Sequence, residues 1–366
     1  MTRPVKREAA ADSSRWSVTT LELPIVQAPM AGGPSTPELA VAVCQAGGLG
    51  FLAAGYKRAE AVREDIQAVR AKTPAPFGVN VFVPTAAPAD PDTFTGYLRR
   101  IAPEAERQGA DLGEPRFDDD DWAAKLDLVC AERPAVVSFT FGCPSREVVD
   151  AMHRSDIAVW VTVTHAAEAR AAHAAGADGL VVQGTEAAGH RGGFLDDGSD
   201  EGGIGLLALL RVVARATPLP MIATGGIMDG AALAAVLCAG AGAGQIGTAL
   251  MLTPEAATAD AQRALLADPS PTRVTRAFSG RPARGIVNRF LDEHSAHAPR
   301  AYPEIHHVTS PLRAAARRRG DADAFNLWAG QAHELVQARP AEEIVREMAA
   351  EARAAVERVS FAVRLR

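Results

Sequence analysis

Residues 158–184 read AVWVTVTHAAEARAAHAAGADGLVVQG and contain two apolar runs separated by a helical pattern. The runs AVWVTV (158–163) and GLVVQG (179–184) are short and continuous, and the Ala-rich stretch 166–175 lies between them. Continuous rather than alternating hydrophobicity is typical of parallel strands that are covered on both faces. This stretch therefore predicts a β-α-β unit of a parallel sheet.

The same rhythm extends in both directions along the chain. Further apolar runs lie at 24–30, 48–54, 76–83, 135–141, 220–226 and 244–250, and helical patterns lie at 36–46, 58–71, 145–153 and 229–239. Eight strands alternating with helices over about 250 residues predict an α/β fold, a (β/α)8 TIM barrel rather than a doubly wound sheet. No G-x-G-x-x-G follows the first run, which also counts against a dinucleotide-binding Rossmann domain.

The barrel is expected to span residues 21–252, after a flexible tail over 1–20. Residues 84–125 form a Pro- and acid-rich insertion after the third strand. Residues 253–366 are expected to form a mainly helical segment that packs on the barrel. Its last part, 340–359, has Pro at the start, Glu in the first turn and apolar residues at helical spacing, so it predicts an amphipathic helix.

Composition excludes several classes of partner. The chain has 366 residues with 38 Lys and Arg against 44 Asp and Glu, a net charge of −6 and only 5% aromatic residues, so nucleic acid is not an expected ligand. The FDDDD run at 117–121 is expected to be a solvated face rather than a metal site. Four widely spaced cysteines in apolar contexts favour free thiols and a reducing, cytoplasmic compartment.

One uncharged stretch is long enough to cross a bilayer. Residues 231–252 read AALAAVLCAGAGAGQIGTALML, but glycines cluster in the middle and Gln245 follows them. A helix over 231–239, a glycine turn and a strand over 244–250 explain this stretch better than a membrane span. The N-terminus has no apolar segment of the kind that a secretory signal requires.

In a barrel of this kind, functional groups lie at the C-terminal ends of the strands and in the loops that follow. Amides and glycines dominate these positions, which hold Gln27, Asn80, Phe141, Thr164, Gln183, Gly225, Gly226, Gly247 and Thr248. The strand ends lack the carboxylate pair of a glycosidase, the lysine of a Schiff-base enzyme and a His–carboxylate cluster for a metal.

Glycine pairs follow the seventh and eighth strands, in ATGGI (223–227) and GQIGT (244–248). Bare backbone N–H groups at these two places can cradle a phosphate. The Gln and Asn side chains at other strand ends can hydrogen-bond a flat heteroaromatic ring. One glycine pair alone would indicate only a tight turn, whereas two pairs favour a phosphorylated aromatic cofactor such as FMN.

The candidate base is His190, in the run VVQGTEAAGHRGGF (181–194) after the sixth strand. An imidazole, whose unperturbed pKa is near neutrality, could remove a proton from a ligand at this rim.

The other polar residues are weaker candidates for a catalytic role. His165 is expected to begin a helix, and Cys143 to be a buried structural thiol. His306 and His307 lie outside the barrel pattern and are expected to pack or face solvent. Arg191 is expected to hold an anionic substrate or to make a surface ion pair.

Taken together, these runs resemble the nitronate monooxygenase family, formerly called 2-nitropropane dioxygenase, whose members bind FMN on a barrel, and specifically its class I branch. The similar segments are PIVQAPMAGG (24–33), GFLAAGY (50–56), FGVNVFVP (77–84), VVSFTFG (136–142), VVQGTEAAGHRG (181–192), IATGGI (222–227), GQIGTALML (244–252), FSGRPARGIVN (278–288) and LWAGQ (327–331). The resemblance implies that His190 is the catalytic histidine. It places the flavin contacts on Met30, Gly32, Asn80, Gln183, Ala188, Gly225, Gly226, Gln245, Ile246, Gly247 and Thr248.

This sequence departs from the family pattern at two positions. Ala188 stands where the family usually has glycine, and Thr140 where many members have histidine. The candidate substrate contacts are Thr140, which is one of these departures, and Arg191, which follows His190. The departures at Ala188 and Thr140 both bear on substrate preference. The methyl group of Ala188 is tolerated only if φ at this position is negative.

The function implied by the resemblance is FMN-dependent oxidation of alkyl nitronates or nitroalkanes, such as propionate 3-nitronate. The expected co-substrate is O2, and the products are a carbonyl compound and nitrite. Two alternatives stay open. One is an NAD(P)H-dependent reductase of quinones or enoyl thioesters that uses FMN on the same fold. The other is a flavin-binding protein without turnover.

Overall fold

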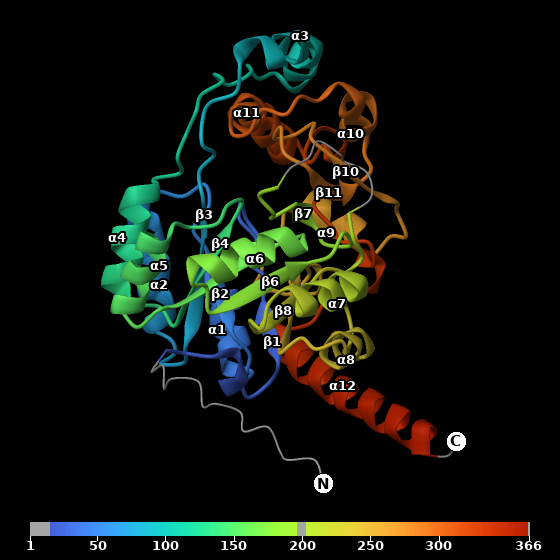
Figure 1. Cartoon of the computed structure of the whole chain (residues 1–366). Coiled ribbons are helices and arrows are strands. Elements are labelled where there is room, and N and C mark those ends of the chain that lie inside the picture. The colour runs from blue at the N-terminus through green and yellow to red at the C-terminus, as the bar shows by residue number, and fades with distance from the viewer. Residues whose placement is uncertain (1–14, 196–202, 365–366) are drawn as a thin grey trace.

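The computed structural model describes residues 15–195 and 203–364, and it confirms the predicted TIM barrel (Figure 1). The strands form one parallel sheet in which each strand neighbours the next one along the chain: β1 (Ile25–Gln27), β2 (Gly50–Ala53), β3 (Phe77–Phe82), β4 (Val136–Thr140), β5 (Ala158–Val163), β6 (Gly179–Gln183), β8 (Met221–Thr224) and β9 (Ala243–Ile246). Backbone bonds close the ring between β1 and β2, because Gln27 N donates to Leu49 O at 2.9 Å and Leu49 N to Ile25 O at 3.0 Å.

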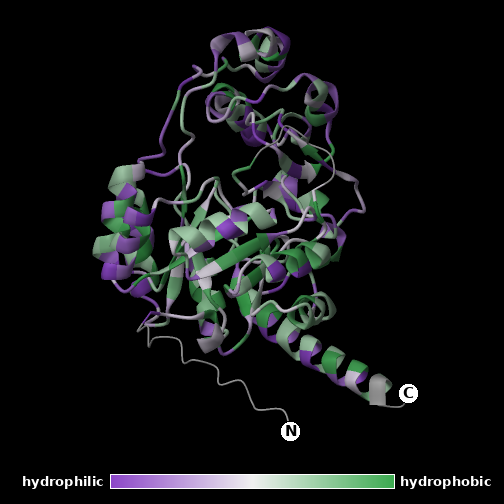
Figure 2. Cartoon of the chain, in the orientation of Figure 1, coloured by the Kyte–Doolittle hydropathy of each residue, from purple (hydrophilic) through white to green (hydrophobic). Residues whose placement is uncertain are grey.

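Helices cover the outside of this ring: α1 (Pro37–Gln45), α2 (Ala59–Arg70), α4 (Trp122–Glu132), α5 (Arg146–Arg154), α6 (Ala166–Ala175), α7 (Leu206–Ala216) and α8 (Gly230–Cys238). Polar caps fix where several of them begin, since the side chains of Thr36, Ser145 and Asp229 each accept from an amide in the first turn. The sequence patterns did not predict α4 and α7. Figure 2 shows the strands largely green between helices with purple outer faces.

The N-terminal end of the barrel is closed by large apolar side chains. Trp160 and Phe51 are fully buried there, with ring centroids 5.9 Å apart. Trp16 packs on Trp160 at 5.8 Å, and Val18 is buried in η1 (Val18–Thr20). The prediction of a flexible tail over 1–20 is therefore wrong for residues 15–20, while residues 1–14 lie outside the described chain. Because apolar side chains fill the N-terminal end of the barrel, ligands are expected at the C-terminal rim.

The insertion after β3 contains a helix, α3 (Pro91–Gln108), which packs against α11 (Glu304–Arg319). Its acidic run is only partly the solvated face that we expected. Asp119 is exposed, but Asp120 accepts from Tyr56 N at 2.9 Å and pairs with the fully buried Lys125 at 2.7 Å. The backbone of Asp120 is left-handed, with φ of 58°, and this turns its carboxylate back toward the loop after β2.

Residues 253–340, here called the cap, cover the C-terminal rim of the barrel. The cap contains α9 (Asp260–Leu266), α10 (Arg289–His294), η3 (Ser295–His297), α11, η4 (Ala322–Ala324) and η5 (His333–Leu335). It is less purely helical than expected, because β10 (Thr272–Thr275) pairs antiparallel with β11 (Ala283–Ile286). β11 also pairs with β7 (Gly189–His190), which belongs to the loop after β6.

The chain returns from the cap to the barrel through α12 (Ala341–Arg364), which confirms the predicted closing helix. α12 packs on α8 and α1 at the end of the barrel opposite α11, as Figure 1 shows. The uncharged stretch 231–252 divides as predicted into α8, a turn and β9, although its end is a 3-10 turn, η2 (Thr248–Leu250), rather than strand. Across residues 15–195 and 203–364, no helix is long and apolar enough to cross a membrane.

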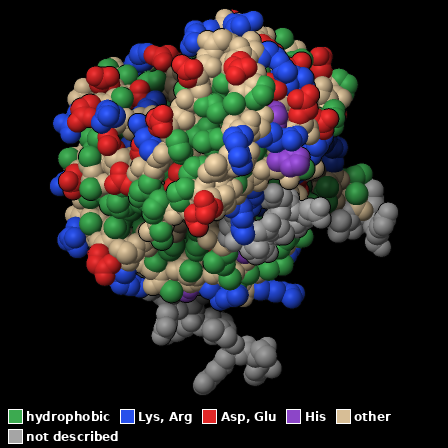
Figure 3. Space-filling model, turned by 90° about the horizontal axis from the view of Figure 1, so that it is seen from above, with side chains coloured by type: hydrophobic (Ala, Val, Ile, Leu, Met, Phe, Trp, Pro, Cys, Tyr) green, Lys and Arg blue, Asp and Glu red, His purple; other side chains and the backbone are tan. Residues whose placement is uncertain are grey.

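On the face seen from above, acidic and basic side chains are interspersed with apolar ones (Figure 3). The cysteines Cys44, Cys130, Cys143 and Cys238 are all free thiols.

Candidate active site

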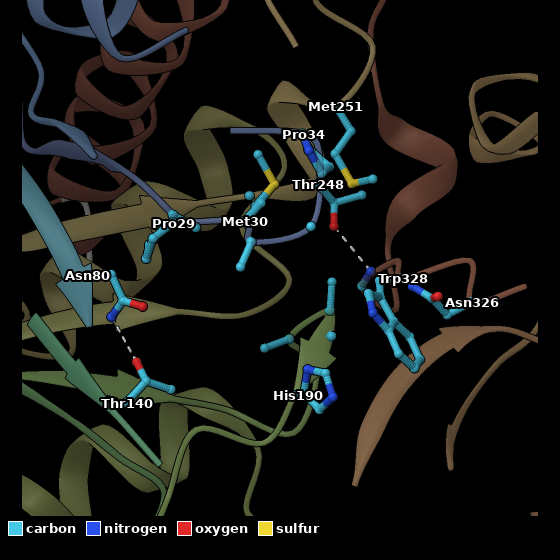
Figure 4. A pocket seen from close by; sticks show the side chains of 18 of the residues that line it. Pro29, Met30, Pro34, Asn80, Thr140, His190, Thr248, Met251, Asn326 and Trp328 are labelled. Atoms are coloured by element: carbon cyan, nitrogen blue, oxygen red, sulfur yellow. Dashed lines mark hydrogen bonds between the residues drawn. The ribbon is translucent and has the colours of Figure 1, made fainter. Parts of the chain in front are cut away.

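A cavity of about 560 Å³ lies between the C-terminal rim of the barrel and the cap (Figure 4). Most of the residues that the sequence predicted as a site line this one cavity: Met30, Gly32, Asn80, Thr140, Gln183, Ala188, His190, Gly225, Gly226, Gln245, Gly247 and Thr248. Two candidates do not line it. Ile246 is buried in the barrel core, where its carbonyl accepts from Ala28 N at 2.8 Å, and Arg191 points elsewhere.

Four backbone amides form what we call the glycine rim: those of Gly225, Gly226, Gly247 and Thr248. None of them donates to a protein acceptor within the described residues. Gly225 and Gly226 have φ of 122° and 69°, and a Cβ on Gly225 would lie 3.0 Å from Ala187 N. Consecutive open N–H groups in such a backbone form an anion-binding concavity, so the geometry suits a phosphate.

Amide side chains fix the neighbouring wall. Gln183 Nε2 donates to His190 O at 3.1 Å, and Gln183 Oε1 accepts from Gly192 N at 2.8 Å, so this side chain holds the loop that carries His190. Asn80 Nδ2 donates to Thr140 Oγ1 at 2.9 Å, as the dashed line in Figure 4 shows, and Thr140 Oγ1 lies 3.2 Å from Thr162 Oγ1. Thr140 therefore orients Asn80 besides facing the cavity.

His190 is half-buried and is enclosed by aromatic rings. Its centroid lies 5.5 Å from Trp328, 5.7 Å from Phe141 and 6.1 Å from Tyr302. Its Nε2 lies 2.8 Å from Ser279 Oγ, and its Nδ1 has no protein partner in the part of the chain described.

Burial, followed by the nearby charges of Arg281 and Arg313, lowers the pKa of His190 to about 3. The unperturbed imidazole pKa near neutrality therefore does not hold for His190 in this site. His190 is a neutral imidazole at neutral pH.

Two arginines clamp the His190 loop. Arg191 donates to Gly184 O at 2.6 Å and to Gln183 O at 3.2 Å, so it does not contact the cavity as a substrate ligand would. Arg281 lies 4.2 Å above the Phe141 ring and donates through Nε to Arg191 O at 3.2 Å. The hydrogen bonds of Arg191 and Arg281 to backbone carbonyls hold this glycine-rich loop in place and so fix the position of His190.

The opposite side of the cavity, here called the cap wall, was missed by the sequence reasoning. It comprises Tyr56, His306, Ser310, Arg313, Arg317, Asn326 and Trp328, of which Tyr56 comes from the loop after β2. The His306 ring stacks on Tyr56 with centroids 4.1 Å apart and an interplanar angle of 6°. His306 thus packs, as expected, but it does so within the site.

A signal for this wall was present in the sequence. Residues 306, 310, 313 and 317 are spaced i, i+4, i+7 and i+11, which places them on one face of a helix. The other expectations for rival residues are confirmed, at least in part. His165 is the N-cap of α6, and Cys143 is a half-buried thiol whose pKa is raised by burial.

The structure also shows how Ala188 fits where the family usually has glycine. Ala188 is not among the described residues with positive φ, whereas the next residue, Gly189, has φ of 66°. The left-handed position in this loop is therefore occupied by glycine, and the methyl group of Ala188 brings no backbone strain.

The chain is a TIM barrel with open amides after its last two strands and a histidine over the same cavity, an arrangement suited to a phosphate-bearing ligand. The family model described as nitronate monooxygenase matches residues 13–351, and the chain belongs to this family. It is therefore an enzyme of the oxidoreductase class.

Similar proteins agree with this assignment. The chain is 40% identical to a nitronate monooxygenase of Paraburkholderia phytofirmans, with 93% of this chain and 94% of the relative covered. It is 41% identical to one of Pseudomonas aeruginosa, with 91% and 97% covered. Among solved structures, a nitroalkane oxidase from Streptomyces ansochromogenes superposes with a TM-score of 0.90 at 49% identity, covering 93% and 98% of the two chains. FabK from Thermotoga maritima gives a TM-score of 0.73 at 26% identity, covering 94% and 97%.

Proposed function

We propose that this enzyme binds FMN and oxidises alkyl nitronates and nitroalkanes, propionate 3-nitronate among them, with O2 to a carbonyl compound and nitrite. The observation that carries this proposal is that one cavity joins the open amides of the glycine rim to the neutral imidazole of His190. Membership of the nitronate monooxygenase family and the similarity to a nitroalkane oxidase support the same chemistry.

The residues present fit an FMN. The four amides of the glycine rim would hold its phosphate, and Asn80, Gln183 and Gln245 offer polar groups around a flat ring. Met30, which also lines the cavity, offers an apolar surface for that ring. When bound, the flavin supplies the two-electron redox chemistry and the reactivity toward O2.

His190 would manage the substrate proton. Ser279 Oγ lies 3.3 Å from Arg281 O, to which it can donate, so it can accept the Nε2–H of His190. This tautomer leaves the lone pair of Nδ1 free to take the α-proton of a neutral nitroalkane. With a nitronate, which has already lost that proton, the imidazole orients the substrate.

The electrostatics favour the nitronate as the better substrate. An imidazole whose pKa is about 3 is a weak base, while Arg281 and Arg313 make the surroundings of His190 positive. A bound nitronate anion is stabilised by these charges and raises the pKa of the histidine beside it. We therefore expect turnover of nitronates to exceed that of the corresponding neutral nitroalkanes.

The decisive experiment is anaerobic mixing of the flavin-loaded enzyme with propyl-1-nitronate or with NADPH, followed by the flavin absorbance. Rapid loss of absorbance with the nitronate, and nitrite release in air, is the expected result. Reduction by NADPH alone contradicts the proposal and favours the reductase. A bound flavin that neither compound reduces favours a binding protein without turnover.

A further inference from the structure

The cap wall contains one buried and one partly buried guanidinium, those of Arg313 and Arg317, which share one neutral acceptor. Arg313, which is 6% exposed, donates through Nη1 to Asn326 Oδ1 at 3.0 Å, and Arg317 donates through Nη2 to the same oxygen at 2.7 Å. The other bonds of Arg313 go to neutral oxygens as well, including His306 O at 3.0 Å. Both arginines lie on α11 and line the cavity.

Neither guanidinium forms an ion pair with an Asp or Glu in residues 15–195 or 203–364. Arg289 of the same cap, by contrast, pairs with the buried Glu104 at 2.7 Å. Burial and the neighbouring Arg317 lower the pKa of Arg313 to about 9, which is the direction expected when a buried cation lacks a counter-ion. Buried charges in proteins normally have a counter-ion, and no Asp or Glu of the described residues supplies one for these two arginines. An anionic ligand could take that place.

A neutral donor lies beside the two cations. His306 Nδ1 is 3.3 Å from Arg313 Nη2, which can only donate, so Nδ1 is the acceptor and the proton of this neutral ring is on Nε2. Nε2 has no partner among the described residues. Nε and Nη2 of Arg313 are already bonded to Thr309, Ser310 and His306, so the donors left for a ligand are one Nη1–H of Arg313, the remaining N–H groups of Arg317 and the Nε2–H of His306.

This place lies close to the proposed base, and none of its residues belongs to the glycine rim. The Tyr302 ring is 6.1 Å from His190 and 6.4 Å from His306, so a single aromatic ring separates the two histidines. The glycine rim already offers open amides for a cofactor phosphate. An anion at Arg313 and Arg317 would thus belong to a second group, a short chain away from the reacting carbon.

We infer that Arg313 and Arg317 form an anion subsite that binds a carboxylate on the substrate and so select nitronates that carry one. A guanidinium fork such as that of Arg317 matches the two oxygens of a carboxylate, and the remaining Nη1–H of Arg313 can add a further charge-assisted bond. The inference rests on the proposed function for the reaction, although the binding of a carboxylate at this subsite stands without turnover.

The test compares propionate 3-nitronate with propyl-1-nitronate, which has the same number of carbons and no carboxylate, on the flavin-loaded full chain. We expect the wild type to prefer the carboxylate by tenfold or more in kcat/KM. Arg317→Ala should lower kcat/KM by about 10–100-fold for the carboxylated substrate, mainly through KM, and by less than about threefold for the other. Arg318→Ala, which removes the same charge from an exposed position of α11, is the matched control and should change neither value.

A second measurement does not depend on turnover. Succinate should raise the thermal midpoint of the wild type and of Arg318→Ala but not that of Arg317→Ala. If succinate gives this pattern while no nitronate is oxidised, the proposed function fails and the subsite stands.

Three results would overturn the subsite: equal loss of kcat/KM for both nitronates, an equal succinate shift in wild type and Arg317→Ala, or loss of FMN from Arg317→Ala. The last result would assign the pair to the cofactor phosphate. A KM for NADPH that rises in Arg317→Ala, without any change for the nitronates, would likewise overturn it.

Discussion

The glycine rim and the cap wall line one cavity but are built in opposite ways. The rim consists of backbone amides from two short stretches that directly follow β8 and β9, whereas the cap wall consists of side chains from the loop after β2, from α11 and from the segment that contains Asn326 and Trp328. Backbone donors select a ligand by shape and are insensitive to side-chain identity. Charged and aromatic side chains select by chemistry. On the function proposed above, the rim would bind the cofactor and the cap wall would select the substrate.

Replacement of His190, which lines the same cavity as the glycine rim and the cap wall, should have the largest effect on activity. We expect His190→Asn to keep its FMN and to lose about 10²–10⁴-fold in kcat/KM for nitroalkanes, because no imidazole remains to accept the proton. Ser279→Ala, which removes only the partner of Nε2, should cost less. The measurement is nitrite release at several substrate concentrations. Full activity of His190→Asn would refute the base assignment.

A single substitution can disturb the glycine rim and leave the residues of the cap wall unchanged. Gly226→Ala places a side chain at φ of 69°, where a Cβ would lie 3.1 Å from Glu186 Cβ. Left-handed strain of about 1–2 kcal/mol should displace the amides and weaken FMN binding about tenfold, which a fluorescence titration of the apoprotein would measure.

A matched control for this change is Gly240→Ala, which introduces similar strain at φ of 105° in the turn after α8, outside the residues that line the cavity. It should leave FMN affinity unchanged. Equal losses in the two variants would mean that strain alone, and not the cradle, lowers the affinity.

Acid should destabilise the protein through the histidines of both regions. The pKa of His190 is lowered to about 3 and that of His306 well below its ordinary value, so below pH 6.5 the unfolded chain binds protons that the native state does not. The free energy of unfolding should therefore fall as the pH drops from 6.5 toward 3, by up to about 1.4 kcal/mol per pH unit for each histidine.

Urea unfolding between pH 4 and 8 would measure this dependence. His190→Asn and His306→Asn should each reduce the slope below pH 6.5 and leave the slope above it unchanged. A wild-type slope in both variants would contradict the assignment of acid sensitivity to these two residues.

The smallest effect is expected at the departure from the family pattern. Ala188→Gly adds backbone freedom at a position without positive φ, so it should change the free energy of unfolding by no more than about 1 kcal/mol and kcat/KM by less than about threefold. Thermal unfolding and nitrite assays would measure both. A tenfold change in kcat/KM would show that the methyl group shapes substrate choice.

Local patterns were sufficient for the strands of the barrel and for the glycine rim, although not for helices α4 and α7. Each strand is a continuous apolar run, and the rim glycines directly follow two of these runs, so periodicity and turn chemistry located both. The cap half depends on long-range contacts. β7 has only two residues, and its pairing of His190 with Ala283 joins segments with no hydrophobic pattern in common.

The same reason explains the errors at single residues. The pKa of His190 is set by burial and by Arg281 and Arg313, which are remote in sequence. Arg191 donates to the carbonyls of Gly184 and Gln183, contacts that no local pattern of the sequence predicts. His306 contacts the site only because α11 lies across the rim, although its helical spacing with Arg313 and Arg317 could be read in advance.

The cap is tied to the barrel at three places: it follows β9 directly, it pairs through β11 with β7, and it leads into α12 on the far end of the barrel. A segment fixed at both ends and in the middle cannot swing open as a rigid body about a single hinge. We then expect exchange of ligands to depend on movements of individual side chains. Release rates should respond to the bulk of the aromatic cap residues that line the cavity, such as Trp328, rather than to the length of any connecting loop.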